Sequence, residues 1–366
     1  MVLKSFPVIS VKGKPFECGR QHGSQARELI RKNVDLYFHL WGDMWGAKRP
    51  EIIEKCHNFI PVIGEYDADI LEELQGIAKG TDLSLEEIIA LNARYELLWG
   101  ERVTRQFRPG GCTSMAALPG VTKDGHTIAG QNWDTGPVHF DYVIILEVEQ
   151  EGKPKVFLST EAGLIGLKGM NSAGLGLCAN CLVSNLDRFE PGVPFFIMIR
   201  KALNAENFTR SMQAILTAKT NVSGNVLMAH QDGEAIDFEV TPEDVGIVHD
   251  EEGILTHSNH FLAFTNRADF KDLFKRFAPS TLFRYHRARR LLELDKGSID
   301  IDSFKRVFSD HFSYPDSICW HVNPRDSKLG QIKTVNSIIM DLKEGAMYIT
   351  EGNPCQNEYV KLTPFS

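Results

Sequence analysis

The residues most suited to chemistry lie where the pattern of the chain changes. Cys112 follows Gly110 and Gly111 directly. A cysteine thiol is the strongest nucleophile among thiol and hydroxyl side chains at neutral pH, and a preceding glycine lets that thiol approach the carbonyl before it. If the Gly111–Cys112 bond were cut, the new α-amino group of Cys112, with a pKa of about 7.7–8.0, would suit a general base. On composition alone, a Gly-Cys pair also fits a turn followed by a small buried thiol.

The segment before this point is dominated by helical patterns. Charged and apolar residues alternate at helical spacing over residues 21–31, 33–45, 67–79 and 83–98. Ser84, followed by Glu86 and Glu87, predicts a helix start, since a serine cap and an acidic first turn satisfy free amides and the helix dipole. We expect the helices to stop before Gly111, because Pro109 and the two glycines disfavour continuation.

The segment after this point alternates between strands and helices. The predicted strands cover residues 113–118, 127–133, 142–149, 155–160, 175–182, 225–230, 235–240, 246–250, 254–258, 337–342 and 346–351. The predicted helices cover residues 194–203, 207–219, 280–294 and 302–308. Asp124-Gly125 and Glu151-Gly152 stand where hairpin turns belong. This order predicts an α+β fold in which two antiparallel sheets have helices packed outside them. Without a flexible linker, one compact body is expected over residues 1–366.

Composition excludes several functional classes. Hydrophobic residues make up 43% and charged residues 24%, as in an ordinary globular protein. The 40 basic and 48 acidic residues give a net charge of −8, so no nucleic-acid partner is expected. The basic run over residues 284–290 fits a solvated helix face. No apolar run approaches the ~20 residues of a membrane span, so no membrane partner is expected either.

The seven cysteines predict free thiols in a reducing, cytoplasmic compartment. Their number is odd, they are scattered, and no secretory signal is recognisable at the start of the chain. Cys178 and Cys181 have redox or metal spacing, but no second Cys/His pair has the spacing of a zinc site, so we interpret them as buried structural thiols. No metal and no cofactor are predicted.

Several short motifs together carry a resemblance to a known family. They are 16–24 (FECGRQHGS), 111–114 (GCTS), 130–134 (GQNWD), 160–166 (TEAGLIG), 169–175 (GMNSAGL), 192–194 (GVP), 256–260 (THSNH) and 314–319 (YPDSIC). In these motifs and their order, the sequence resembles the penicillin acyltransferase family of N-terminal-nucleophile enzymes. The resemblance covers nearly the whole chain. It implies a four-layer αββα sandwich.

The resemblance also implies that the chain cuts itself between Gly111 and Cys112. An α fragment of residues 1–111 would remain associated with a β fragment of residues 112–366, and Cys112 would be the nucleophile. Asn259 matches the family's oxyanion-hole residue, and its side-chain NH₂ is a suitable neutral donor. The implied activity is hydrolysis or transfer at a small-molecule acyl amide or acyl donor, without a cofactor.

Two further residues match family positions near the nucleophile, and a third departs from the pattern. Asp134 could hold the α-ammonium group or accept a proton during maturation, although an Asx-turn before Gly136 is the structural alternative. Ser114 could hydrogen-bond the Cys112 amine. Trp320 stands where the family has an arginine that binds an anionic group, so this substrate-binding position has an apolar face here. This departure disfavours penicillin precursors and coenzyme A thioesters as substrates.

The remaining motif residues are interpreted as structural. Gly19 and Gly23 are four apart on a helix and would permit close packing, with His22 between them in a structural role. Asn132, Glu161 and Asn171 are expected in turns or buried polar networks. Gly110 replaces an acidic residue that precedes the family's scissile glycine, which bears on the rate of self-cleavage.

Two other functional classes stay open at this point. His257 and His260 flank Asn259 and suggest an unprocessed thiol hydrolase with a Cys–His pair, or less well a metal site. A non-enzymatic scaffold that kept the fold would instead have an intact chain and an unreactive Cys112.

Overall fold

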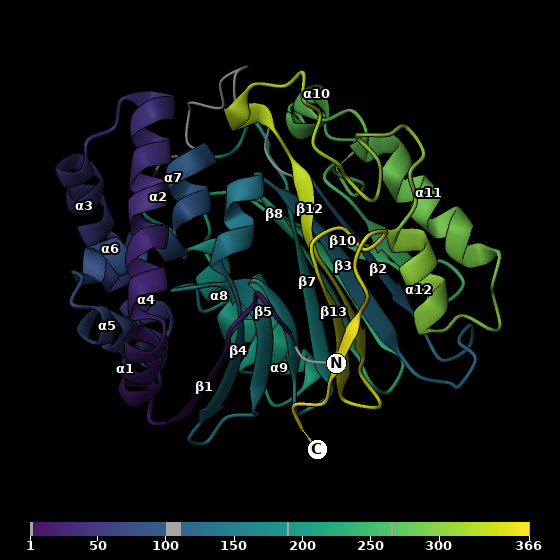
Figure 1. Cartoon of the computed structure of the whole chain (residues 1–366), viewed down its shortest axis with the longest axis horizontal. Helices are drawn as coiled ribbons and strands as arrows, with labels where there is room; N and C mark the ends of the chain where they lie inside the picture. The colour runs from purple at the N-terminus through teal and green to yellow at the C-terminus, as the bar shows by residue number, and fades with distance from the viewer. Residues whose placement is uncertain (1–2, 100–110, 189, 265, 366) are drawn as a thin grey trace.

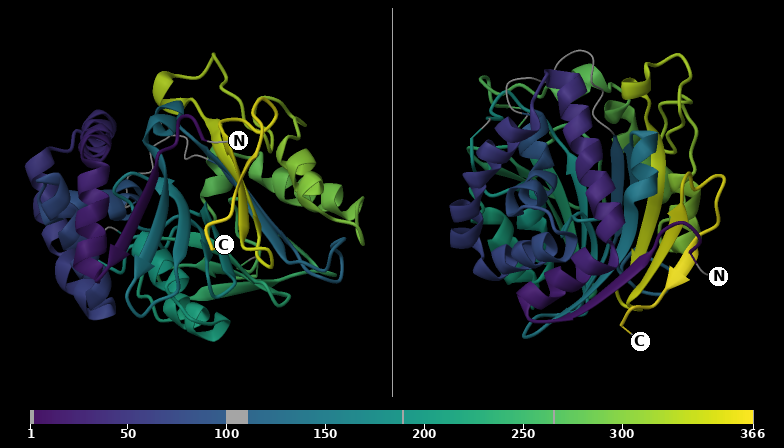
Figure 2. Two further views of the ribbon diagram at one scale, coloured as in Figure 1. Left: turned by 60° about the horizontal axis from the view of Figure 1, so that its bottom comes forward. Right: turned by 60° about the vertical axis from the view of Figure 1, so that its left-hand side comes forward.

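The described chain forms two stacked β-sheets between layers of helices (Figure 1). The computed structural model describes residues 3–99, 111–188, 190–264 and 266–365. Helices of the first hundred residues cover one side, and α11 (Thr281–Glu293) and α12 (Ile301–Phe308) cover the other (Figures 1 and 2). The predicted αββα arrangement is confirmed.

Within the described residues the larger sheet has eight strands in the order β1-β4-β5-β6-β7-β8-β9-β10. Their bounds are β1 Val8–Gly13, β4 Val143–Gln150, β5 Val156–Glu161, β6 Lys168–Asn171, β7 Leu175–Cys181, β8 Gly224–His230, β9 Glu234–Val240 and β10 Val245–His249. The prediction of purely antiparallel sheets is wrong at one edge, where β1 pairs parallel with β4. Parallel neighbours need a long crossover, which the helices between these strands provide.

The smaller sheet has the order β11-β2-β3-β12-β13-β14, and every described pair in it is antiparallel. Its strands are β2 Cys112–Ala117, β3 Ile128–Thr135, β11 Ile254–His257, β12 Lys333–Asp341, β13 Ala346–Glu351 and β14 Val360–Leu362. Gly125, in the β2–β3 connection, has a φ of 68°, as the predicted Asp-Gly turn requires. The change from helix to strand predicted near residue 111 is confirmed.

The helices form two groups. On the larger sheet's side lie α1 Pro15–Gln25, α2 Arg27–Trp45, α3 Arg49–His57, α4 Phe59–Tyr66, α5 Ala68–Thr81, α6 Leu85–Asn92, α7 Arg94–Trp99, α8 Phe195–Leu203 and α9 Phe208–Leu216. The later helices are α10 Phe274–Phe277, α11 Thr281–Glu293 and α12 Ile301–Phe308. Strands β1, β6 and β14 and helices α3, α4 and α10 were not predicted. The predicted Ser84 cap is confirmed, since its Oγ accepts the Glu87 N–H at 3.2 Å.

Close approach of α1 and α5 confirms the predicted role of two glycines. A Cβ on Gly19 would lie 1.9 Å from the Glu73 carbonyl oxygen, and one on Gly23 would lie 2.5 Å from the Ile77 carbonyl oxygen. Gly76 and Gly80 on α5 are equally tight against α1. Side chains at these positions would force the two helices apart.

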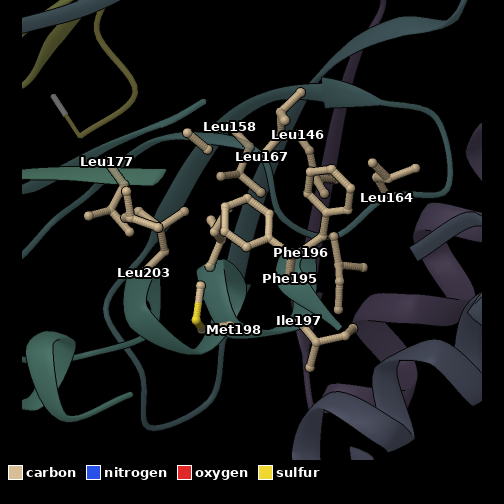
Figure 3. Close-up of a cluster of buried hydrophobic side chains, with 14 of the residues drawn as sticks. Leu146, Leu158, Leu164, Leu167, Leu177, Phe195, Phe196, Ile197, Met198 and Leu203 are labelled. Atoms are coloured by element: carbon tan, nitrogen blue, oxygen red, sulfur yellow. The ribbon is translucent and has the colours of Figure 1, made fainter. Parts of the chain in front are cut away.

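Apolar side chains fill the space between α8 and the larger sheet (Figure 3). The labelled cluster consists of Leu146, Leu158, Leu164, Leu167, Leu177, Phe195, Phe196, Ile197, Met198 and Leu203, all buried. A second cluster lies between the smaller sheet and the helices α11 and α12. No helix of the described residues combines the length and the apolar composition needed to cross a bilayer.

Candidate active site

Cys112 is the first residue of β2, which lies between β11 and β3 in the smaller sheet. Its side chain belongs to the core between the two sheets and is 3% exposed. Burial is the main reason why the pKa of this thiol is raised to about 12, and the nearby Asp134 carboxylate adds to the shift. The thiol therefore needs a base before it can act as a nucleophile.

Both the carbonyl oxygen and the N–H of the Gly111–Cys112 peptide bond make hydrogen bonds. The Gly111 carbonyl oxygen accepts the Asp134 backbone N–H at 2.9 Å. The Cys112 N–H donates to Asn259 Oδ1 at 2.8 Å. A Cβ on residue 111 would lie 2.7 Å from the Trp320 ring, so only glycine fits here without displacing the indole.

Asn259 is fixed through both ends of its side-chain amide. Oδ1 accepts from Cys112 and from Arg284 Nη2, the latter at 2.9 Å, and Nδ2 donates to the Cys181 carbonyl at 2.9 Å. An amide NH₂ has two N–H donors, so one is available to a developing oxyanion. The Asn259 backbone N–H donates to Thr281 Oγ1 at 2.7 Å, at the start of α11.

The two histidines near Asn259 make hydrogen bonds that hold the loop carrying it. His257 Nε2 lies 2.8 Å from Glu239 Oε1, and the same carboxylate accepts the backbone N–H groups of Leu262 and Ala263. Burial lowers the pKa of His257, but the carboxylates of Asp237 and Glu239 outweigh it and raise the pKa to about 9. His257 is therefore charged at neutral pH and is not available as a base.

His260 is the second flanking histidine. Its Nδ1 lies 3.1 Å from Thr281 Oγ1, and burial lowers its pKa to about 3. The contacts of His257 with Glu239 and of His260 with Thr281 thus favour structural roles for both.

Arg284 is a site residue that sequence reasoning missed. It is fully buried, and its Nη1 donates to the Cys112 carbonyl at 2.6 Å and to Thr113 Oγ1 at 2.9 Å. The prediction of a solvated face for residues 284–290 is wrong at this residue. Helical spacing could have predicted its burial, because Arg284, Ala288 and Leu292 lie on one face of α11 and are all buried.

Asp134 stands near the end of β3, directly beside the Gly111 carbonyl. Its Oδ1 accepts the Thr334 hydroxyl at 2.6 Å, and Oδ2 has no hydrogen-bond partner among the described residues. Burial raises the pKa of this carboxyl to about 7, against the opposing effects of Arg284, Thr334 and Lys168. A carboxyl group with that pKa can both take up and release a proton at neutral pH.

Lys168 was also missed by sequence reasoning. It comes from β6 in the other sheet, is fully buried, and its Nζ lies 4.3 Å from the Trp133 ring centroid. Its ammonium group has no hydrogen-bond partner among the described residues. Burial lowers its pKa to about 7, and the largest opposing effect comes from Cys112. The only signal was one lysine within the apolar run of residues 167–170.

Ser114 lies on the same face of β2 as Cys112 but contacts a different group from the expected amine. Its Oγ accepts Asn180 Nδ2 at 2.8 Å, and Asn180 Oδ1 accepts Gln131 Nε2 at 2.7 Å. This chain of hydrogen bonds joins β2 and β3 to β7 across the two sheets.

Trp320 closes the site from the segment before β12. Its backbone N–H donates to Thr334 Oγ1 at 2.9 Å, and Thr334 in turn donates to Asp134. The Arg284 guanidinium lies 5.4 Å from the indole centroid. Trp320 is 3% exposed, so its ring packs against Gly111 and the arginine.

The other motif residues lie in buried polar networks. Glu161 pairs with Arg94 at 2.8 Å, Asn132 donates to the Phe308 and Ile318 carbonyls, and Asn171 donates to the Leu203 carbonyl. His22 Nε2 accepts the Gly163 N–H at 3.3 Å. Cys178 and Cys181 are buried free thiols, as predicted. Gly110 lies outside the described residues.

The chain is similar in sequence to known acyltransferases. The sequence model of the family "Acyl-coenzyme A:6-aminopenicillanic acid acyl-transferase" matches residues 121–356. The "acyl-coenzyme A:6-aminopenicillanic-acid-acyltransferase 40 kDa form" of Emericella nidulans is 29% identical over 313 residues, which are 85% of this chain and 84% of that protein.

Two solved structures are also similar at lower identity. A mutant of conjugated bile acid hydrolase from Clostridium perfringens is 17% identical and has a TM-score of 0.46, over 69% of this chain and 96% of that one. Penicillin V acylase from Agrobacterium tumefaciens is 13% identical and has a TM-score of 0.43, over 66% and 83%.

Proposed function

We propose that this chain, which belongs to the acyl-coenzyme A:6-aminopenicillanic acid acyl-transferase family, cuts its own Gly111–Cys112 bond and then works as an N-terminal cysteine amide hydrolase or acyltransferase. The observation that carries the proposal is the hydrogen bonding of that bond. Its carbonyl oxygen accepts the Asp134 N–H, and its N–H donates to Asn259. A donor on the carbonyl oxygen is what stabilises the charge of a tetrahedral intermediate.

Self-cleavage would begin when the Asp134 carboxylate takes the thiol proton of Cys112. The sulfur attacks the Gly111 carbonyl carbon, and the negative charge on oxygen is met by the Asp134 N–H. The C–N bond then breaks, the proton passes to the departing nitrogen, and a thioester joins residues 111 and 112. Water hydrolyses this thioester, which frees the thiol and leaves Gly111 with a carboxylate.

Turnover would use the α-amino group that this cleavage exposes. The free amine takes the thiol proton, the sulfur attacks the acyl carbon of the substrate, and the leaving amine receives the proton. The second N–H of Asn259 would stabilise the oxyanion. Arg284 would hold both Asn259 and the Cys112 carbonyl in place. Water or another amine then takes the acyl group from sulfur.

The substrate class we infer is a small N-acyl amine or amide, with hydrolysis favoured over transfer. Trp320 provides an apolar wall without charge beside Gly111, which suits an uncharged acyl chain. The Cys–His thiol hydrolase is the weaker alternative, because His257 is paired with Glu239 and His260 with Thr281.

The two fragments are proposed to stay together as one domain over residues 1–366. Strand β1 of the first fragment pairs with β4 of the second, and the buried Arg94–Glu161 and Glu73–Arg200 pairs join them. Separation would expose these charges without partners, which is costly. We also propose a cytoplasmic location, supported by seven cysteines that are all free thiols.

Intact mass spectrometry of the denatured protein tests the proposal. The wild type should give two species that correspond to residues 1–111 and 112–366. Cys112→Ala should give one species of 41.1 kDa and no hydrolysis of N-acyl amines. Cys178→Ala, at another buried thiol, is the matched control and should process normally. Turnover by intact Cys112→Ala would overturn the proposal.

A further inference from the structure

Four potential metal ligands meet outside the candidate active site. His311, Cys319, His321 and Cys355 each offer one ligand atom, and these atoms all lie within 4.8 Å of one another. His311, Cys319 and His321 come from the segment between α12 and β12, and Cys355 follows β13. No described active-site contact uses these four side chains.

Four of the six separations between these atoms are close to those expected for the ligands of one tetrahedral ion, and all six are within 4.8 Å. The Nε2 atoms of the two histidines are 3.1 Å apart, and His321 Nε2 is 3.5 Å and 3.4 Å from the two sulfurs. The sulfurs of Cys319 and Cys355 are 3.4 Å apart. Zn–S bonds of about 2.3 Å and Zn–N bonds of about 2.0–2.1 Å at tetrahedral angles place ligand atoms roughly 3.3–3.8 Å apart.

We propose that His311, Cys319, His321 and Cys355 bind one Zn²⁺ ion as a structural site. Two thiolates and two imidazoles are a ligand set that zinc prefers, and four protein ligands close its coordination sphere. Asn353 Nδ2 donates to Cys319 Sγ at 3.5 Å, as an outer hydrogen bond to a thiolate ligand would. The two positive charges of the ion balance the two thiolates.

The site would fasten the segment that carries Trp320. Cys319 and His321 are its immediate neighbours, and Asn353 Nδ2 also donates to the Trp320 carbonyl at 2.7 Å. Trp320 packs on Gly111, and its N–H reaches Asp134 through Thr334. The ion would therefore fix the indole that covers the proposed scissile bond, without touching the reacting atoms.

Metal analysis tests the site directly. Wild-type protein purified under reducing conditions should contain one equivalent of zinc by inductively coupled plasma mass spectrometry. Cys355→Ser and His311→Ala should lose that zinc, and both positions are exposed, so folding should survive. His249→Ala, at an exposed histidine of β10, is the control and should keep it.

A spectroscopic readout guards against adventitious zinc. Wild type stripped with a chelator and then given Co²⁺ alone should show the intense visible bands of tetrahedral thiolate coordination. Cys355→Ser should lose or shift these bands. A wild type with no more zinc than Cys355→Ser, without the Co²⁺ bands, would overturn the proposal, as would a Cys319–Cys355 disulfide in a non-reduced digest. The unprocessed Cys112→Ala chain should still hold zinc, so this proposal and the proposed function fail separately.

Discussion

Replacing Asp134 by asparagine should make the folded chain more stable at alkaline pH while it removes the proposed base. Asp134 is 1% exposed, and burial raises its pKa from 3.8 to about 7. The folded state thus holds this proton more tightly than the unfolded chain does. Stability therefore falls as pH rises from about 4 to about 7, because the unfolded chain releases this proton in that range while the folded chain still holds it. Asparagine does not ionise and keeps an acceptor for Thr334.

The size of the effect follows from the shift in pKa. Burying this carboxyl group costs about 4 kcal/mol at pH 8 and about 2 kcal/mol at pH 5. Asp134→Asn should therefore gain about 2 kcal/mol relative to its parent between these pH values. With an unfolding entropy of roughly 2.1 cal/mol/K per residue, this is about 3 °C in Tm for a chain of this length.

Differential scanning calorimetry at pH 5 and pH 8 measures this difference. Both proteins should carry Cys112→Ala, so that self-cleavage does not alter the chain being melted. Other buried acids titrate in both proteins and cancel in the comparison. Asp124→Asn, at an exposed aspartate, should change nothing. The same pH dependence of Tm with and without Asp134 would refute the assignment of the raised pKa.

The same substitution with Cys112 intact should slow self-cleavage by about 10²–10⁴-fold, the usual contribution of a general base. The fraction of intact chain is followed over time by mass spectrometry. If Asp134→Asn is more stable at pH 8 but is not processed, the loss of cleavage is not caused by unfolding, and the carboxylate has a catalytic role. Normal processing would show that another group takes the thiol proton.

Two further substitutions test the neighbours of Cys112. Gly111→Ala should block self-cleavage, since its Cβ would lie 2.7 Å from the Trp320 ring, and adding Trp320→Leu should partly restore the cleavage that mass spectrometry detects. Gly120→Ala is the control, because a Cβ there meets nothing within 4 Å. Wild-type processing by Gly111→Ala would contradict the described packing of Gly111 against Trp320. Burial lowers the pKa of Lys168 from 10.5 to about 7, so between pH 7 and pH 10 only the unfolded chain binds this proton. The folded wild type should therefore gain about 3 kcal/mol of stability across this range, and Lys168→Met should lack that gain. An unchanged Tm profile, matching that of the exposed Lys32→Met, would mean that Lys168 is not the group responsible.

Local patterns in the sequence determined much of the fold and the centre of the site. Helical and strand periodicities act over a few residues, so the main helices and most strands were predictable, as was the break before Cys112. Short edge elements were missed, because β1 pairs with a strand far along the chain and β14 has only 3 residues. The spacing of Gly19 and Gly23, four residues apart on one helix, was enough to predict that another helix packs closely there.

The tertiary structure decided which polar residues meet. In the sequence, Arg284 is one of several arginines in a helical pattern, and only the packing of α11 against β2 brings it to Cys112. Lys168 lies over the Trp133 ring only because the two sheets stack. Likewise, Cys355 lies beside Cys319 only after β12 and β13 have paired. Contacts between residues so far apart depend on the summed packing of the sheets, which no local pattern encodes. The sequence alone thus pointed to the nucleophile, and folding assembled the charges and ligands around it.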